Sequence, residues 1–400
     1  MHLSKPARAA LVVRTLKLAP LLLAATLLSA CLGDNDAPGR KFSTEVVFGD
    51  SLSDIGTYAV GAIGAVHGGK FTVNSIPASA QNWSERVAAQ LSLPAPCPAQ
   101  TGLEGDAAQG YYVPVTYHDG CTNYAQGGAR GTEPIGPHNK AIEPQLGFTT
   151  VPVVTQIQNH LAKSGGSFSG SEAVFVFAGG NDFLWQSDAM TAAVITALPG
   201  QIASDILSGA CVPVDTAGSN CVGGAITNAV VALSPTYIAA MELAGTQLAA
   251  LINNDIVGKG ARYVVVLNLP DVSKTPSVKG QPASILAVIS AMSTVFNNKL
   301  AAGLASNSSG SILQVDLAAR FNEWAANPAS FGFSNFTDPA CDLTRPSPNL
   351  LGSALTCSTA NVIAGDVSHY AYADTVHVTP YTDSLTAELV LSEMGKRGWR

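Results

Sequence analysis

Apolar residues along this chain fall into two recurring patterns, short continuous runs and longer segments with a repeat of three to four residues. Continuous runs between polar or glycine-rich stretches are typical of strands that are buried on both faces. They predict strands at 44–48, 172–177, 262–269 and 312–317, and a short strand at 122–129 that runs into a glycine turn. The longer repeat predicts helices at 81–93, 151–163, 226–255, 284–304, 318–326 and 381–394.

The predicted strands and helices alternate, and this order indicates the fold class. Strands that alternate with helices form parallel β-α-β units, whose helices cover the faces of the sheet. We therefore expect an α/β fold, a three-layer α/β/α sandwich around a doubly wound, mostly parallel sheet of five strands. No internal repeat or linker interrupts residues 44–400, which are predicted to form one domain.

The first thirty residues have the composition of an export signal. Four Lys or Arg residues and no acidic residue accompany an apolar run at 18–28 that is too short to span a bilayer. The run ends in Leu28-Ser29-Ala30-Cys31, which resembles the bacterial lipobox. We predict that residues 1–30 are a lipoprotein signal peptide, that Cys31 carries lipid and that 31–43 is a tether. An ordinary secretory signal cut near Ala30 is the alternative.

A lipid on Cys31 would determine where the protein resides. The residue that follows is Leu32 rather than an aspartate. By resemblance to enterobacterial sorting rules, this favours the outer membrane of a Gram-negative-type bacterium over retention at the inner membrane. No other apolar run is expected to be long enough to span a membrane.

Six cysteines remain once Cys31 is set aside, and they form three neighbouring couples within loop-like segments. Sequence alone leaves their connectivity open, and we predict the local pairing. It joins Cys97 to Cys121, Cys211 to Cys221 and Cys341 to Cys357. Zinc binding is the alternative, but neither a Cys-x-x-Cys motif nor a nearby histidine pair supports it.

The charge balance bears on possible partners. The formal net charge is −7, and it becomes more negative once the basic leader is removed. Excess negative charge without a basic cluster argues against nucleic acid as a partner. We expect no metal and no organic cofactor.

A candidate nucleophile follows the first predicted strand. The strand stops at Gly49-Asp50-Ser51, and a side chain at the carboxyl end of a parallel strand faces the crevice where open α/β sheets bind ligands. Gly-Asp-Ser alone is ordinary turn chemistry. The prediction therefore depends on partners elsewhere in the chain.

Those partners are predicted near the other end of the chain. Asp374 precedes His377 by three residues on a probable loop. The carboxylate can accept the Nδ1–H of the histidine and leave Nε2 free for Ser51, as in a serine triad. The other histidines lack such company and are expected to be structural or surface residues.

Acyl transfer also needs donors for the negative charge that develops on the substrate oxygen. We predict the backbone N–H of Ser51, the backbone N–H of Gly127 and the side-chain amide of Asn181. Gly128 could donate in place of Gly127, because the two glycines are adjacent.

Four blocks together resemble the SGNH or GDSL superfamily of serine ester hydrolases, in its lipase-like branch. They occur in the family's order and span roughly residues 44–385. They are Gly49-Asp50-Ser51-Leu52, Asn123-Tyr124-Ala125-Gln126-Gly127-Gly128-Ala129, Gly179-Gly180-Asn181-Asp182 and Asp374-Thr375-Val376-His377.

The resemblance implies a flavodoxin-like sheet, and it implies roles for the five candidate residues. Ser51 would be the nucleophile, Asp374 and His377 would complete the triad, and Gly127 and Asn181 would join Ser51 in the oxyanion hole. One departure concerns the residue after the histidine, which is Val378 where the family usually has proline.

The sequence thus predicts a serine carboxylic-ester hydrolase, an esterase or lipase, that acts through an acyl-enzyme on small-molecule or lipid esters. Two alternatives use the same site, a carbohydrate O-acetyl esterase and an acyltransferase. A third is a non-catalytic surface lipoprotein that only binds its partner.

Overall fold

The computed structural model describes residues 40–76, 80–211 and 219–400, and residues 41–400 form one compact unit. The predicted signal peptide at 1–30, Cys31 and most of the tether at 31–43 lie outside the described residues. The lipid anchor therefore stays a prediction.

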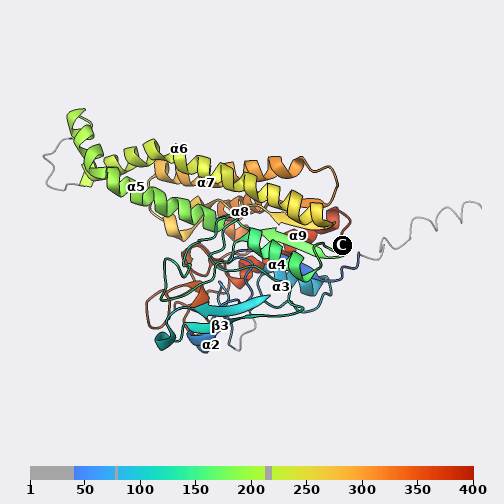
Figure 1. Ribbon diagram of the computed structural model, residues 1–400. Coiled ribbons are helices and arrows are strands. Elements are labelled where there is room, and N and C mark those ends of the chain that lie inside the picture. Colours follow the sequence, from blue (N-terminus) through green and yellow to red (C-terminus); the bar gives the residue numbers. More distant parts are fainter. Residues whose placement is uncertain (1–39, 77–79, 212–218) are drawn as a thin grey trace, which may run out of the picture. The chain divides into compact units, whose positions relative to one another are not determined.

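The centre of the fold is a parallel sheet (Figure 1). Its order is β1-β4-β5-β6, with β1 at Glu45–Gly49, β4 at Ala173–Phe177, β5 at Val264–Leu267 and β6 at Ile312–Val315. The expected fifth strand is reduced to a single parallel bridge, in which Asn123 lies beside Val47. The prediction of five strands is wrong in this respect, because the chain turns into its glycine loop after one bridge.

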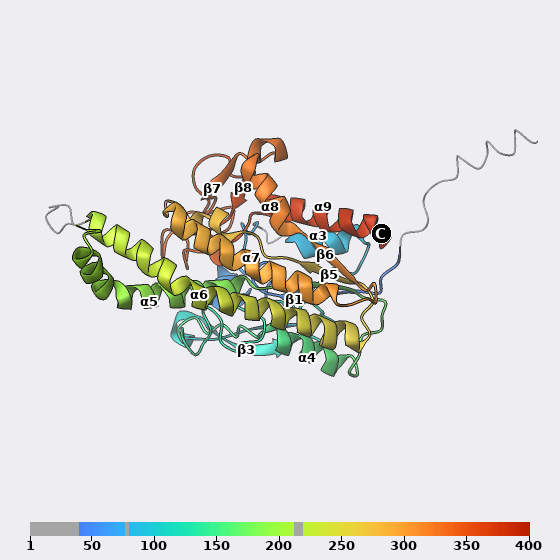
Figure 2. The same ribbon diagram turned by 90° about the horizontal axis from the view of Figure 1, so that it is seen from above.

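The parallel strands are apolar throughout because both faces of the sheet are covered. Alternate side chains point to opposite faces. Phe48 and Val176 belong to one hydrophobic cluster, with apolar side chains of the helices between residues 153 and 305, whereas Phe175 and Val265 belong to a second, with apolar side chains of the helices at 83–90, 317–326 and 380–396. Figure 2 shows these two helical layers on either side of the sheet. The predicted three-layer α/β/α architecture is confirmed.

The helices that form these layers agree with most of the predicted segments. Their bounds are α2 Gly61–Ala65, α3 Trp83–Gln90, α4 Val153–Lys163, α5 Gly180–Leu207, α6 Ser219–Leu251, α7 Ala283–Ala305, α8 Leu317–Ala326 and α9 Pro380–Lys396. Helix α3 begins at a capping box, in which Asn82 accepts backbone N–H groups of the first turn and the Glu85 side chain accepts the N–H of Asn82. Helix α6 continues into a π-helical turn at Ile252–Ile256.

Helix α5 was not predicted from the sequence. Its first residues belong to the Gly-Gly-Asn-Asp block, and Pro199 and Gly200 lie in its interior. Both residue types normally interrupt helices. Here the chain continues through them, so that α5 is 28 residues long.

Among the residues that the structure describes, three helical runs are long and apolar enough, by length and composition, to cross a membrane. They are Gly180–Leu207, Cys221–Lys259 and Ala283–Ala305, each with a mean hydropathy of 1.3. The expectation that no further apolar run reaches this length is wrong, because these helices combine many alanines with Ile, Leu and Val and contain few charged residues. In the structure these helices pack on one another along one face of the sheet (Figures 1 and 2).

The predicted disulfide pairing is present. Cys97 bonds Cys121, Cys211 bonds Cys221 and Cys341 bonds Cys357. The first encloses an antiparallel hairpin of β2 (Gln100–Glu104) and β3 (Tyr112–Tyr117), where only a surface loop was expected. A two-stranded parallel pair, β7 (Asn335–Pro339) and β8 (Tyr370–Tyr372), lies in the carboxyl-terminal part.

Helices α6 and α7 approach closely at Gly245, and this contact generates a stability prediction. A Cβ at this position would lie 2.4 Å from the backbone oxygen of Phe296. We therefore expect Gly245→Ala to lower the free energy of unfolding by about 1–3 kcal/mol in urea titrations.

Gly200→Ala is the matched control, because a Cβ there meets no heavy atom within 4 Å. Alanine should raise the free energy of unfolding by roughly 0.5–1 kcal/mol at this helical site. Equal effects of the two substitutions would contradict the close packing of α6 on α7.

Candidate active site

The turn after β1 presents Ser51 at the carboxyl edge of the sheet. The Gln156 side chain of α4 fixes this turn through two hydrogen bonds to the backbone of Gly49. It accepts the N–H of Gly49 at 2.9 Å, and its amide donates to the Gly49 carbonyl at 2.8 Å. Gln156 lies on a buried helix face and belongs to no motif, so its role was not predicted from the sequence.

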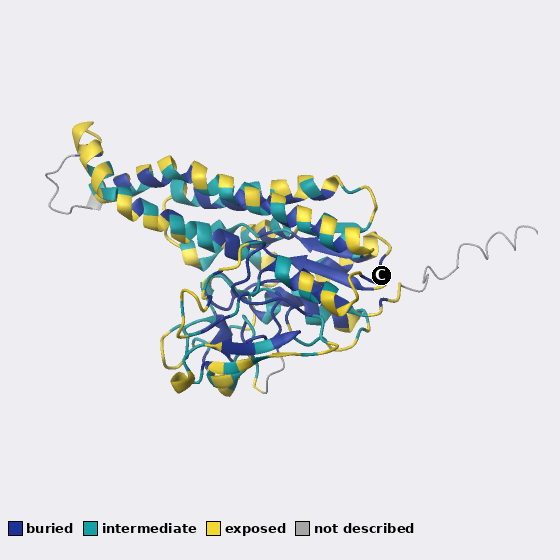
Figure 3. Ribbon diagram, viewed as in Figure 1, coloured by how far each residue is buried: buried dark blue, intermediate teal, exposed yellow. Residues whose placement is uncertain are grey.

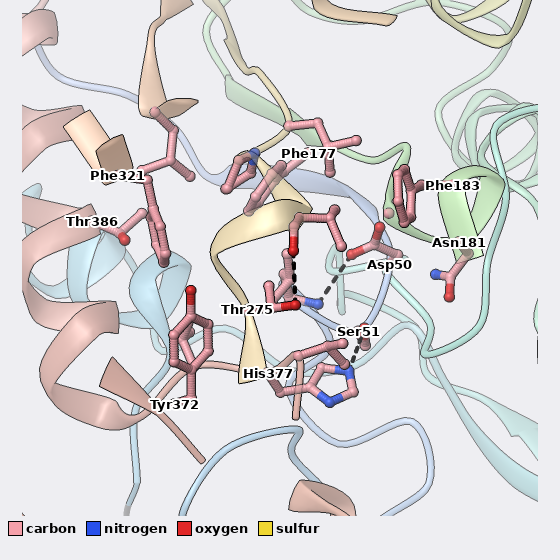
Figure 4. Close-up of a pocket in the computed structure, with 18 of the residues that line it drawn as sticks. Asp50, Ser51, Phe177, Asn181, Phe183, Thr275, Phe321, Tyr372, His377 and Thr386 are labelled. Carbon is pink, nitrogen blue, oxygen red and sulfur yellow. Dashed lines mark hydrogen bonds between the residues drawn. The ribbon is translucent and has the colours of Figure 1, made fainter. Parts of the chain in front are cut away.

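The structure brings together the three residues predicted as a triad. His377 Nε2 lies 2.9 Å from Ser51 Oγ (Figure 4), and His377 Nδ1 lies 2.8 Å from Asp374 Oδ2. With Nδ1–H donating to the carboxylate, Nε2 is left to accept the hydroxyl hydrogen of Ser51. This arrangement can increase the nucleophilicity of the serine oxygen.

Asp374 is held by backbone groups as well as by the imidazole. Its Oδ1 accepts the N–H groups of Val376 and His377 at 2.9 and 2.8 Å, and its Oδ2 also accepts the N–H of Ala354 at 2.8 Å. Donors around a carboxylate stabilise its charged form. Burial opposes ionisation, but His377 and these donors hold the pKa of Asp374 well below its usual range.

The same pair determines the ionisation of the histidine. Burial alone would lower the pKa of His377, but the Asp374 carboxylate, its hydrogen bond to the ring and the more distant Asp50 raise the pKa above 6.5. Burial raises the pKa of Asp50 to about 7, although the Leu52 N–H and His377 favour its charged form.

The residue after the histidine does not disturb this geometry. The His377 carbonyl accepts the N–H of Ala373 at 2.8 Å, and Val378 forms a bridge with Tyr372. Thr379 then caps α9, and Pro380 occupies its first turn. The proline that the family usually has directly after the histidine thus stands three residues after it, at a helix start where a missing N–H leaves no hydrogen bond unmade. The backbone of His377 is fixed instead by its hydrogen bond with Ala373.

The predicted Gly127 donor does not agree with the structure. The Gly127 N–H donates to Asp54 Oδ2 at 2.9 Å and is therefore occupied. Gly128, the alternative, lines a cavity together with Ser51, Asn181 and His377. Its φ of 81° lies in the left-handed region that glycine adopts without strain.

Asp54 fixes the loop at Gly127 and Gly128 against the segment that follows Ser51. This buried carboxyl group accepts the N–H groups of Gly56 and Thr57 through Oδ1 and that of Gly127 through Oδ2. Burial raises its pKa to about 6 despite these donors. An aspartate three residues after Ser51 is visible in the sequence, but its contact with Gly127 was not predicted.

Asn181 lies in the first turn of α5, beside Ser51. Its side-chain amide donates one hydrogen to the Ala129 carbonyl at 3.0 Å, which fixes the amide and leaves its second hydrogen for another acceptor. The neighbouring Asp182 pairs with Arg130 at 3.1 Å and accepts the Gly131 N–H at 2.9 Å. Asp182 therefore has a structural role, because its two carboxylate oxygens are taken up by these contacts.

Two cavities meet at the serine. Including their open mouths, their volumes are about 790 and 830 Å³, and both are lined by Ser51, Asn181 and His377. The first is largely apolar, and Figure 4 shows Phe177, Phe183 and Phe321 around it. The second is more polar, with His138, Glu143 and Arg345 among its lining residues.

Phe71 packs against the imidazole from the side of the second cavity. The two ring centroids are 4.9 Å apart, and the same side chain contacts the ring of Tyr58.

In the described part of the chain, no group of three or more His, Cys, Asp and Glu side chains is placed to hold a metal ion.

No protein-family model matches the chain. Two curated relatives, each named Esterase EstA, come from Pseudomonas aeruginosa and Pseudomonas putida. Each is 27% identical over 384 residues, which cover 94% of this chain and 50% of the relative. The chain thus spans half the length of these relatives.

Two solved structures are also similar in part. One is phospholipase A1 from Streptomyces albidoflavus NA297, at 15% identity over 89% of this chain and 99% of that one, with a TM-score of 0.37. The other is an extracellular lipase from Streptomyces rimosus, at 17% identity over 88% and 98% of the two chains, also with a TM-score of 0.37.

The geometry predicts how His377 titrates. Its pKa should lie above the usual 6.5, so the ring becomes charged as the pH falls through this raised pKa. Asp374→Asn should lower this pKa, because the carboxylate that raises it is gone while burial remains. Imidazole proton signals in NMR, assigned by their loss in His377→Gln, measure both values.

Asp366→Asn is the control, since this exposed carboxylate lies outside the site. A His377 pKa that is unchanged in Asp374→Asn, or changed equally in both variants, would contradict the contact between Asp374 and the imidazole.

Proposed function

We propose that this protein is a serine carboxylic-ester hydrolase, with Ser51 as nucleophile, His377 as general base and Asp374 as the group that orients the base. The observation that carries the proposal is the hydrogen-bonded chain from Ser51 Oγ through His377 to Asp374, at a junction of two cavities. The similarity to two proteins named esterase supports the same class of reaction.

In the first half of the reaction, Ser51 Oγ bonds to the ester carbonyl carbon as His377 Nε2 takes the hydroxyl proton. The carbonyl oxygen becomes an oxyanion. Its donors in this proposal are the backbone N–H groups of Ser51 and Gly128 and the free amide hydrogen of Asn181. The bond to the alcohol oxygen then breaks, and His377 gives its proton to the departing alcohol.

In the second half, water attacks the acyl-enzyme. His377 takes a proton from the water, and the new tetrahedral intermediate collapses as the bond to Ser51 Oγ breaks. The proton returns to the serine, and a carboxylic acid is released. Asp374 stays ionised throughout and stabilises the transient imidazolium, in keeping with its low pKa.

The two cavities indicate which half of the substrate lies where. The apolar one, with Phe183, Leu269 and Phe321 in its wall, suits an acyl chain. The more polar one, which carries Arg345, suits the alcohol half. This favours an esterase or lipase with acyl chains longer than acetyl over a carbohydrate O-acetyl esterase.

The proposed location rests on the sequence alone. Export by residues 1–30 and a lipid on Cys31 would place the enzyme at the outer membrane, tethered by the following residues. The membrane would then be a partner through that lipid.

Hydrolysis of p-nitrophenyl acetate, butyrate and octanoate tests the proposal. We expect kcat/KM to rise by up to about fourfold per methylene until the apolar cavity is filled, because each buried methylene contributes about 0.8 kcal/mol. Ser51→Ala should reduce turnover to the background rate, whereas Ser330→Ala, an exposed serine outside the site, should leave it unchanged.

Activity on acetate alone would instead favour an O-acetyl esterase. Turnover that survives in Ser51→Ala, or its absence from the native protein on every ester, would contradict the proposed mechanism.

A further inference from the structure

The two longest helices in the described part of the chain, α5 and α6, form an arm that begins near the candidate active site. Helix α5 starts just after β4 and runs away from the sheet, and α6 returns antiparallel to it (Figures 1 and 2). Helix α7 runs beside the later part of α6, where Gly245 meets Phe296, so both views show the far end of the pair extending past α7. We call residues 190–211 and 221–235 the distal arm.

The distal arm is tied together by contacts that make it a defined element. The Cys211–Cys221 disulfide closes its end. The buried Asp205 accepts hydrogen bonds from Gln201 at 2.8 Å and from Asn228 at 3.2 Å, which links α5 to α6. Ala225 and Ala229 are buried, which is consistent with close packing of the two helices.

The outer surface of the distal arm is apolar. Leu207 is 88% exposed, Ile195 65% and Val231 52%, and Ile206 and Val222 are exposed as well. Figure 3 shows exposed residues along both helices at this end. Five exposed aliphatic side chains on one projecting element are more than scattered surface positions, and such patches mark sites of interaction.

The described part of this surface is also uncharged; Asp215, in the segment that joins the two helices, lies outside the described residues. Among the described residues from 189 to 241, the one ionisable acidic or basic side chain apart from tyrosine and cysteine is Asp205, and it is buried. The sequence contains no Lys or Arg between Lys163 and Lys259. Segments that bind anionic membranes or nucleic acids use lysine and arginine for that purpose, so charge does not favour either partner.

We propose that the distal arm binds an electrically neutral lipid surface. Exposed aliphatic side chains without neighbouring charges can enter the boundary between lipid headgroups and acyl chains at little desolvation cost. The same helix α5 supplies Asn181, Phe183 and Leu184 to the apolar cavity at Ser51. Binding through the arm would therefore attach the helix that lines this cavity to the lipid surface.

This binding goes beyond ester hydrolysis and can be measured without turnover. Flotation of the full chain with phosphatidylcholine vesicles gives the bound fraction, and Cys31→Ser in every sample removes any lipid at that position. Ile195→Glu with Leu207→Glu should lower the affinity for vesicles about tenfold or more. Ile76→Glu with Ile142→Glu, two exposed isoleucines outside the arm, is the matched control and should not lower it.

Fluorescence quenching of a single introduced tryptophan tests whether the arm itself, and not another part of the chain, contacts the lipid. Tryptophan at position 207, introduced as Leu207→Trp, should be quenched by brominated phosphatidylcholine. Tryptophan introduced as Ile142→Trp should not show additional quenching. Each is compared with the native protein, whose own tryptophans give the background.

Loss of affinity in the arm variant together with quenching at 207 supports the proposal. Equal affinity of arm and control variants, or no added quenching at 207, overturns it. So does a dimer that the arm substitutions dissociate in the absence of vesicle binding, because the arm would then bind a second copy. Hydrolysis of p-nitrophenyl butyrate, a soluble ester, should be the same in all variants; its absence would contradict the enzyme proposal and leave the binding result intact.

Discussion

The hydrogen bond between Ser51 Oγ and His377 Nε2 is the interaction on which the functional interpretation depends. It joins residues 326 positions apart in the sequence. One partner follows the first strand, and the other lies in the loop that leads into the last helix. The fold brings the two residues together, because the strand that leads to Ser51 and the helix that follows His377 pack within the same domain. Gln156 hydrogen-bonds the turn before Ser51, and Asp374 hydrogen-bonds the ring of His377.

Several carboxyl groups are buried in this part of the fold, and their environments shift their pKa values in different directions. Asp374 is buried yet strongly acidic, because the imidazole and three backbone N–H groups stabilise its carboxylate. Asp50 and Asp54, equally buried, have pKa values raised to about 7 and about 6. Asp383, which accepts the Trp83 N–H at the start of α3, has a pKa raised to about 8 by burial. The imidazole beside Asp374 thus lowers the pKa of that carboxyl group, whereas burial raises the pKa of the other three.

Much of the sheet and most helices could be predicted, because buried parallel strands and amphipathic helices leave their periodicity in the sequence. Helix α5 could not, since Pro199 and Gly200 normally interrupt helices and only packing against α6 shows that they do not here. The β2–β3 hairpin was hidden in a segment rich in proline, glycine and cysteine. The length of the fifth strand was overestimated, because the residues around the single bridge at Asn123 have the same sequence pattern as a longer strand.

The candidate site shows the same division. Ser51, Asp374 and His377 were identified as residue types with suitable spacing, and the structure places them within hydrogen-bonding distance. The choice between Gly127 and Gly128 could not be made from two adjacent glycines. It depends on where Asp54 lies, because its carboxylate takes the Gly127 N–H. Long-range hydrogen bonds of this kind have no signature in the sequence.

The central claim is that the histidine at 377 makes the hydroxyl of Ser51 unusually reactive. Treatment with a fluorophosphonate, followed by peptide mass spectrometry, tests this most directly, because the reagent forms a stable adduct only with an activated serine. The account predicts one adduct, on Ser51, which is lost in Ser51→Ala and forms far more slowly in His377→Gln. An unmodified native protein, or an adduct on another serine, would contradict it.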